Sequence, residues 1–335
     1  MTDRRLHLNA FLMPVGHHEA AWRLPESDPN ANLEIQHYIS LARTAERGRF
    51  DSVFLADSPV LFANPERRPS GKLEPTIILT AIATATERIG LIGTASTTYN
   101  EPYNLARRFA SLDFVSGGRA GWNIVTTAGD DAARNFGLDG VPAHKSRYAR
   151  AAEFVEVSTK LWDSWEDDAI VADKEAAIHA DSAKVHTFEH EGEFFSVAGP
   201  LNVPRSPQGY PLLVQAGSSE NGKDFAALYA EAIFTAQPTF EEGKAFYDDV
   251  KDRVGKVGRD PRKGRSAGKK ISAQPCTAAD NPLRAWSTWA GHSRASIRCT
   301  PASPANALET TTSGSVFASR RRLSASTRAS LIPSM

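Results

Sequence analysis

The sequence predicts an α/β protein built as a (β/α)8 TIM barrel. Short apolar segments rich in β-branched residues recur along the chain, and each is followed by a helical pattern. These segments are nearly all apolar rather than alternating, which is typical of parallel strands covered on both faces. No glycine-rich dinucleotide turn follows the first of them, so a closed barrel is favoured over an open doubly wound sheet.

Six strand–helix units are predicted in order before residue 262. Gly48 and the Gly117–Gly118 pair stand where two of the helices should end. The predicted strands are Leu6–Met13, Ser52–Ala56, Ile89–Thr94, Ala120–Val125, Leu212–Gln215 and Ala232–Thr235, and the predicted helices are Leu33–Arg47, Pro75–Thr86, Pro102–Val115, Ala143–Trp165, Glu220–Ala230 and Phe240–Val257.

A long charged insertion, residues 166–210, separates the fourth predicted helix from the fifth strand. Within it, His186–Val197 has the pattern of a β-hairpin that turns around Glu191-Gly192. Long excursions of this kind in a barrel often cover the active site. We therefore predict that the insertion is a lid.

The composition changes abruptly after Pro261. Residues 262–335 carry a net charge of +10 and are rich in Ser, Ala and Arg, whereas residues 1–261 carry −10. No strand or helix pattern is sustained in the basic tail, although a closed barrel needs a seventh and an eighth unit there. The sequence thus predicts a barrel over 1–261 that is incomplete at its C-terminal side. Our hypothesis is that the tail is out-of-frame translation, which the other two reading frames past codon 261 would test.

Charge and cysteine content exclude several classes of protein. The acidic barrel region argues against a nucleic-acid surface. The first apolar stretch is interrupted by Asn9 and Pro14, so neither a signal peptide nor a membrane span is expected. Cys276 and Cys299 lie in the tail without the spacing of a zinc site. We expect a cytoplasmic protein with no metal and no structural disulfide.

Polar residues follow the predicted strands at corresponding positions. In a barrel the reactive groups gather at the carboxyl ends of the strands. Each of these residues alone is better explained as a turn or cap residue, but their joint occurrence favours a site. The candidates are His17 and His18 after the first strand, Asp57 after the second, Thr94 and Ser96 at the third, Asn123 and Thr126 at the fourth, and Ser218 and Ser219 after the fifth.

Two further patterns leave alternatives open. Ser218-Ser219 pass from a strand directly into a helix, which suits either a phosphate site or a plain N-cap. His144 and Tyr148 lie on one face near the start of a helix, a pattern that on its own favours a surface helix with one aromatic docked on the core over a site. No nucleophile with a neighbouring base is found, which favours a bound cofactor.

Several stretches resemble the bacterial-luciferase-like flavin monooxygenases, and within them the group of nitrilotriacetate monooxygenase component A and dibenzothiophene-sulfone monooxygenase. The resemblance covers about residues 5–261 and excludes the tail. The matching stretches are Phe50–Asp57, Glu87–Leu91, Ser96–Tyr103, Leu105–Asp113, the Ser-Gly-Gly-Arg-x-Gly-Trp-Asn block of Ser116–Asn123, and the His144-x-x-x-Tyr148 pair.

The resemblance implies a barrel that binds FMN at its carboxyl end. It implies that the phosphate is held by Ser218 and Ser219, with Asn123 and Ser96 as weaker candidates beside the flavin ring. His17 would face the substrate, and His144 or His17 would donate a hydrogen bond to a flavin peroxide. The flavin contacts carried over from the family are Asp57, Thr94, His144, Tyr148, Ser218 and Ser219.

The implied activity is that of a two-component monooxygenase. A separate NAD(P)H:flavin oxidoreductase would supply FMNH2, and O2 would oxygenate a small organic substrate with cleavage of a C–N or C–S bond. Two alternatives stay open: a deazaflavin-dependent reductase of the same superfamily, and an inactive relic whose open barrel edge is left unpaired. Such an edge would also permit a homodimer.

Overall fold

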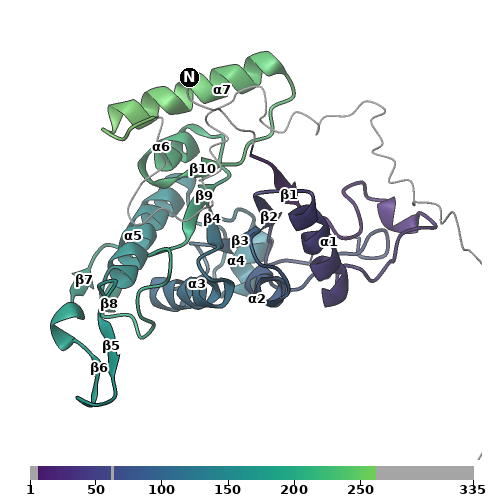
Figure 1. Cartoon of the computed structure of the whole chain (residues 1–335). Coiled ribbons are helices and arrows are strands. Elements are labelled where there is room, and N and C mark those ends of the chain that lie inside the picture. The colour runs from purple at the N-terminus through teal and green to yellow at the C-terminus, as the bar shows by residue number, and fades with distance from the viewer. Residues whose placement is uncertain (1–6, 62–63, 262–335) are drawn as a thin grey trace, which may run out of the picture. The chain divides into compact units, whose positions relative to one another are not determined.

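The computed structural model describes residues 7–61 and 64–261, and its centre is a six-stranded parallel sheet (Figure 1). The strands lie side by side in their order along the chain, and every neighbouring pair is parallel. The predicted α/β class is therefore confirmed, as a half-barrel of parallel strands. Its strands are β1 (Asn9–Phe11), β2 (Ser52–Leu55), β3 (Gly90–Ser96), β4 (Ala120–Val125), β9 (Leu212–Gln215) and β10 (Ala232–Ile233).

Helices connect successive strands, and neighbouring helices pack against one another along the sheet. The six predicted helices are present with small changes at their ends. One short helix, α4, was not predicted, because six residues following Gly129 are too few to show a helical period. The helices are α1 (Ile35–Arg47), α2 (Pro75–Ala85), α3 (Pro102–Ser116), α4 (Asp130–Asn135), α5 (His144–Trp162), α6 (Glu220–Tyr229) and α7 (Phe240–Lys256), with 3-10 turns at Ala21–Arg23 and Ser182–Lys184.

Aromatic side chains fill the layer between the sheet and the helices. Trp122 of β4 lies 6.0 Å from Phe109 and 5.7 Å from Phe154, measured between ring centroids. Its indole Nε1 donates to the Ala95 carbonyl at 3.0 Å, and Nε1 of Trp162 donates to Ala106 at 2.9 Å. Burying these rings together with their N–H groups satisfied stabilises the contact of α3 and α5 with the sheet.

A smaller apolar cluster lies on the other face of the sheet. It contains Phe54, Ile92 and Val214, with Phe11 and Phe234 packed against them. Phe11 is in edge strand β1 and Phe234 follows edge strand β10, yet their ring centroids are 5.8 Å apart. The sheet must therefore curve around this cluster, as a barrel wall does.

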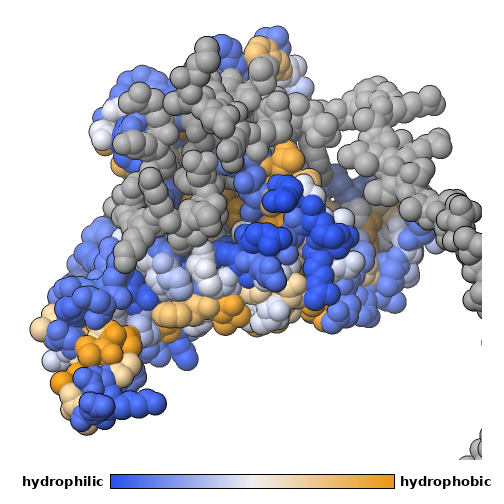
Figure 2. Space-filling model, in the orientation of Figure 1, coloured by the Kyte–Doolittle hydropathy of each residue, from blue (hydrophilic) through white to orange (hydrophobic). Residues whose placement is uncertain are grey.

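The insertion consists of two antiparallel hairpins. The hairpin of β7 (Glu189–Glu191) and β8 (Ser196–Ala198) confirms the hairpin predicted around Glu191-Gly192. The hairpin of β5 (Ile170–Asp173) and β6 (Ile178–Ala180) was not predicted, because all of β5 is exposed and gives no burial pattern. Figure 2 shows orange apolar side chains on this hairpin at the lower left.

The contacts of the insertion run along α5 and to the amino end of β4. Backbone N–H groups of Phe194 and Phe195 donate to Glu153 in the middle of α5. The side-chain amide of Gln208 donates to the carbonyl of Ala120, the first residue of β4, at 2.7 Å. The lid role of residues 166–210 stays a prediction.

Several predictions concern residues outside the described ranges. The basic tail, both cysteines and the out-of-frame hypothesis all fall within 262–335. The boundary at residue 261 and the incomplete barrel therefore remain predictions.

Candidate functional site

The carboxyl edge of the sheet brings polar side chains of β3 and β4 together. Thr94 and Asn123 are opposite each other in the parallel register, and Asn123 is in turn opposite Val214 of β9. The Asn123 amide Nδ2 donates to Thr94 Oγ1 at 2.8 Å, and both side chains are buried. Oδ1 of Asn123 has no hydrogen-bond partner among the described residues. A buried acceptor left open in this way is available to a ligand donor.

A second polar group lies where α5 and α6 begin, and we call His144, Tyr148 and residues 217–222 the α5–α6 junction. His144 is the first residue of α5, and its Nδ1 lies 2.9 Å from Nδ2 of Asn221 in α6. The rings of His144 and Tyr148 are 5.0 Å apart, as expected for residues four apart on one helix face. The junction therefore joins residues that are far apart in the sequence.

Glycines let the turn before α6 approach Tyr148 closely. A Cβ atom added at Gly217 would lie 2.7 Å from the Tyr148 hydroxyl, and one added at Gly222 would lie 3.0 Å from both that hydroxyl and the Gly217 backbone. The buried amide of Gln215 lies beside the same turn, and its Oε1 has no partner among the described residues. The turn is thus a close-packed backbone cradle with an open acceptor beside it.

The turn before α6, residues 217–219, carries two serines with different surroundings, and we call it the serine turn. Ser219 is the N-cap of α6, and its Oγ accepts from the Gly222 N–H at 3.2 Å. Oγ of Ser218 lies 3.1 Å from Oγ1 of Thr235, which also accepts from Gln237 at 2.8 Å. Thr235 was missed as a site residue because it stood at the end of a predicted strand without a motif around it.

Asp57 and His17 follow β2 and β1 but make no described contact with the α5–α6 junction. Oδ1 of Asp57 lies 3.4 Å from Nζ of Lys72. His17 is largely exposed. The loss of part of its hydration, and then the neighbouring His18, lower its pKa. The structure therefore brings together Thr94 with Asn123 and His144 with Tyr148 and the serine turn, and places Asp57 and His17 on separate loops after the first two strands.

The residues of the junction fit the phosphate group of FMN. The first turn of α6, in which Ser219 already accepts from the Gly222 N–H, presents backbone N–H groups and the positive end of the helix dipole. Glu220 stands in this turn, but its carboxylate is engaged by Lys223 and by Arg253 of α7, both at 2.5 Å. These cations hold the pKa of Glu220 below its usual range. The only acid in the first turn is thus neutralised, which favours binding of an anion.

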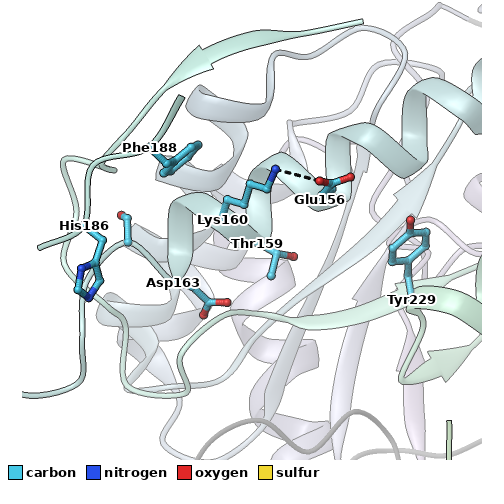
Figure 3. A pocket seen from close by; sticks show the side chains of 8 residues that line it. Glu156, Thr159, Lys160, Asp163, His186, Phe188 and Tyr229 are labelled. Carbon is cyan, nitrogen blue, oxygen red and sulfur yellow. Dashed lines mark ion pairs between the residues drawn. The ribbon is translucent and has the colours of Figure 1, made fainter. Parts of the chain in front are cut away.

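A surface cavity of about 460 Å³ lies at the opposite end of α5 (Figure 3). Lys160 crosses it and pairs with Glu156 at 2.9 Å. Because α5 begins at the carboxyl edge and runs antiparallel to the strands, its late residues lie towards the amino edge. We therefore place the candidate site at the α5–α6 junction and not in this cavity. The cavity is lined by Glu156, Thr159, Lys160, Asp163, Ser164, His186, Phe188 and Tyr229.

Residues 7–61 and 64–261 contain neither a metal-binding cluster nor a membrane-spanning helix. No group of three or more His, Cys, Asp or Glu side chains is arranged to hold a metal ion there. In the same ranges, no helix combines the length and the apolar character needed to cross a membrane.

Comparison with known families gives a match to the luciferase-like monooxygenase profile over residues 15–329. The match thus extends beyond residue 261, into the segment that the sequence analysis separated from the barrel. Nitrilotriacetate monooxygenase component A of Aminobacter aminovorans is 50% identical over 77% of this chain and 59% of its own length. N-acetyl-S-(2-succino)cysteine monooxygenase of Bacillus subtilis is 47% identical over 78% of this chain and 59% of its own length.

Solved structures agree with these relatives. Long-chain alkane monooxygenase has a TM-score of 0.73 at 38% identity, covering 78% of this chain and 63% of the other. EDTA monooxygenase of Chelativorans sp. BNC1 has a TM-score of 0.70 at 38% identity, covering 77% and 62%. The chain spans about 60% of the length of the relatives that it matches.

Proposed function

Because the chain belongs to the luciferase-like monooxygenase family, we propose that it is the flavin-binding, oxygenating part of a two-component monooxygenase. Its cofactor would be FMN, reduced by a separate NAD(P)H:flavin oxidoreductase, and its co-substrate O2. Bound reduced FMN would supply the electrons that activate O2. The proposal extends to a cytoplasmic location and to cleavage of a C–N or C–S bond in a small organic substrate.

The observation that carries this proposal is the convergence of His144, Tyr148 and the serine turn at the α5–α6 junction. The first turn of α6, with Ser218 and Ser219, would hold the phosphate. Thr94 and Asn123, with one open buried acceptor between them, would hold the polar edge of the flavin ring. Asp57, on the loop after β2, completes the proposed set of contacts.

We infer that His144 would donate a hydrogen bond into the site. The Asn221 amide Nδ2 can only donate, so Nδ1 of His144 accepts and the neutral ring carries its proton on Nε2. An Nε2–H fixed in this way can stabilise negative charge that develops on oxygen. We assign His144 this role and keep His17, from the loop after β1, as the donor on the substrate side.

Names of relatives support the proposed partner. One relative is component A of nitrilotriacetate monooxygenase, and others are subunits A and B of pristinamycin IIA synthase from Streptomyces pristinaespiralis. A chain of this kind would receive its reduced flavin by diffusion from a reductase. The insertion 166–210 would shield the loaded site from water, and an open sheet edge would allow a homodimer.

Anaerobic titration of the full chain with photoreduced FMN and with a reduced deazaflavin would test the proposal. Tryptophan fluorescence should be quenched to saturation by reduced FMN and not by the deazaflavin. Saturation by the deazaflavin alone would instead support a deazaflavin-dependent reductase. Binding of neither cofactor would support an inactive relic.

A second step tests His144 and His17. With a flavin reductase, NADH and a panel of relatives' substrates, His144→Ala and His17→Ala should keep FMN binding but form less product per NADH consumed. Unchanged coupling in both variants would remove these histidines from the proposed chemistry.

A further inference from the structure

Arg147, one residue before Tyr148 in α5, is a buried cation. The residue is 7% exposed, and its Nε has no hydrogen-bond partner among the described residues. Among residues 7–61 and 64–261, the guanidinium forms no ion pair. Buried arginine is normally paired with a carboxylate or fully hydrogen-bonded, because burying an unpaired charge is costly.

Two buried hydroxyls of the loop after β3, which contacts α5 through Arg150, also lack partners in the described part of the chain. The hydroxyls of Tyr99 and Thr98, in the loop after β3, accept and donate no hydrogen bond within the described part of the chain. Burial raises the pKa of Tyr99, while the positive charge of Arg147 lowers it and Asp130 raises it. Asp130 is itself engaged, since its Oδ1 accepts from the Val141 N–H at 2.9 Å.

The loop that carries Tyr99 is held in place by other contacts. Thr97 N–H donates to the Val125 carbonyl at 2.9 Å, and Asn100 Nδ2 donates to the Ser96 carbonyl at 2.8 Å. Arg150, one turn along α5, donates to the carbonyls of Thr97 and Asn100 at 3.2 and 3.3 Å. Arg150 thus satisfies the backbone of this loop and leaves Arg147 without a structural role there.

We propose that Arg147, Tyr99 and Thr98 form an oxyanion-binding site at the carboxyl edge of the sheet, for a phosphate or carboxylate group. A guanidinium, a phenol and a hydroxyl are all hydrogen-bond donors, and together they match the acceptor oxygens of such a group. The ring of Tyr99 is fixed by nearly parallel stacking on Phe136, which follows α4, with centroids 4.6 Å apart. The donors are therefore preorganised before the anion arrives.

The position of the site limits the anion to two sources. Arg147 is adjacent in sequence to Tyr148, whose hydroxyl contacts the serine turn, so the phosphate of the flavin is one source. A carboxylate of the substrate is the other, entering between the loops after β3 and β4. The inference rests on the proposed function, because it locates the anion at the proposed flavin site.

The test compares the wild-type full chain with Arg147→Met, which keeps the volume and removes the charge. Binding of FMN, riboflavin, inorganic phosphate and nitrilotriacetate is measured by calorimetry, and the unfolding midpoint is measured without ligand. Arg88→Gln is the matched control, because it removes one positive charge from a side chain that is 69% exposed. A lost charge-assisted contact should weaken binding about 10- to 100-fold.

The binding measurements distinguish the flavin phosphate from a substrate carboxylate as the anion. Weaker FMN binding with riboflavin unchanged supports the site and assigns it to the flavin phosphate. Weaker nitrilotriacetate or phosphate binding with FMN unchanged supports the site and assigns it to a substrate carboxylate. In both cases the unfolding midpoint of ligand-free Arg147→Met should equal or exceed that of wild type, because the unpaired charge is gone.

Three results would overturn the inference: unchanged binding of every probe, equal weakening of FMN and riboflavin, or a clearly lower midpoint for ligand-free Arg147→Met with no selective loss of an anion. A wild-type chain that binds neither flavin contradicts the proposed function alone, provided that phosphate or nitrilotriacetate binding still depends on Arg147. Arg147→Lys adds a check. The lysine ammonium restores the positive charge but not the planar, two-pronged guanidinium, so it should recover only part of the affinity.

Discussion

Helix α5 carries a partly buried charge, Glu153, and a buried one, Arg147, and their surroundings differ. Glu153 accepts hydrogen bonds from the N–H groups of Phe194 and Phe195 at 3.0 and 2.9 Å and pairs with His190 at 3.1 Å. Arg147, two turns earlier, has no such partner within the described chain. The first charge is satisfied by the protein's own residues, and the second is left for a ligand.

The charge of Glu153 has a structural role, whereas that of Arg147 has a role in binding. The satisfied, partly buried carboxylate of Glu153 fastens the β7–β8 hairpin to α5, so its removal should cost stability. An unsatisfied cation and the hydroxyls beside it lower stability in the free protein and are expected where binding is selected instead. Changes on the two sides of α5 should therefore have opposite effects on stability.

The largest effect is expected from Glu153→Ala. It leaves two backbone N–H groups and His190 without their acceptor, which should lower the free energy of unfolding by about 3 kcal/mol. Urea unfolding followed by tryptophan fluorescence measures this loss. Glu153→Gln, which keeps one acceptor oxygen, should lose clearly less. Equal losses in the two variants would show that the carboxylate oxygens are not what holds the hairpin.

Low pH should weaken the contacts between Glu153 and the β7–β8 hairpin. Burial alone would raise the pKa of Glu153, but His190 and the N–H groups of Phe194 and Phe195 outweigh it, so the pKa lies below its usual range. A lowered folded-state pKa gives stability that is present above the ordinary glutamate pKa of about 4.3 and is lost as the pH falls through the folded value. The difference in unfolding midpoint between wild type and Glu153→Gln should therefore shrink below about pH 4. A difference that is constant from pH 7 to pH 3 would contradict the assignment.

On the ligand side of α5, Gly222→Ala should reduce binding more than stability. A methyl group there improves helix propensity by up to about 1 kcal/mol, but it meets the backbone of Gly217 at 3.0 Å. The serine turn must then shift by a few tenths of an ångström, and FMN affinity should fall about tenfold. Calorimetric titration with FMN, beside thermal unfolding of the ligand-free variant, checks both values. A lower midpoint with unchanged affinity would refute this reading of the turn.

The smallest effect is expected from Tyr99→Phe. The variant removes a buried hydroxyl that has no partner in the described structure, so the ligand-free protein should be unchanged or stabilised by up to about 1 kcal/mol. The stacking of the ring on Phe136 is retained. A loss of more than 1 kcal/mol in urea unfolding would mean that this hydroxyl has a structural partner.

The sequence predicted the framework well where burial is continuous. β4 was predicted at its observed bounds, Ala120–Val125, because its residues are apolar and flanked by Gly118 and polar loop residues. The hairpin in the insertion was predicted from Glu191-Gly192. The resemblance implied that His144 and the two serines meet at one flavin, but the contact of His144 with Asn221 of α6 was not predicted, because periodicity places residues on one helix and not against another element.

What the sequence could not predict are features that depend on tertiary surroundings. Arg147 and Arg150 are three residues apart and look alike in the sequence, yet only Arg150 contacts backbone carbonyls. Burial of a charge depends on which loop packs over it, and the conformation of residues 97–101 has no local signature. The same limit applies to Thr235, whose contact with Ser218 joins the segments that follow β10 and β9.

The central claim is that the α5–α6 junction binds FMN, and the most direct test is an equilibrium titration of the full chain with FMN. Flavin fluorescence should show saturable binding to wild type. Tyr148→Phe, which keeps the ring but removes the hydroxyl at the serine turn, should weaken it about tenfold. Absence of binding to wild type, or equal affinity for wild type and Tyr148→Phe, would contradict the claim.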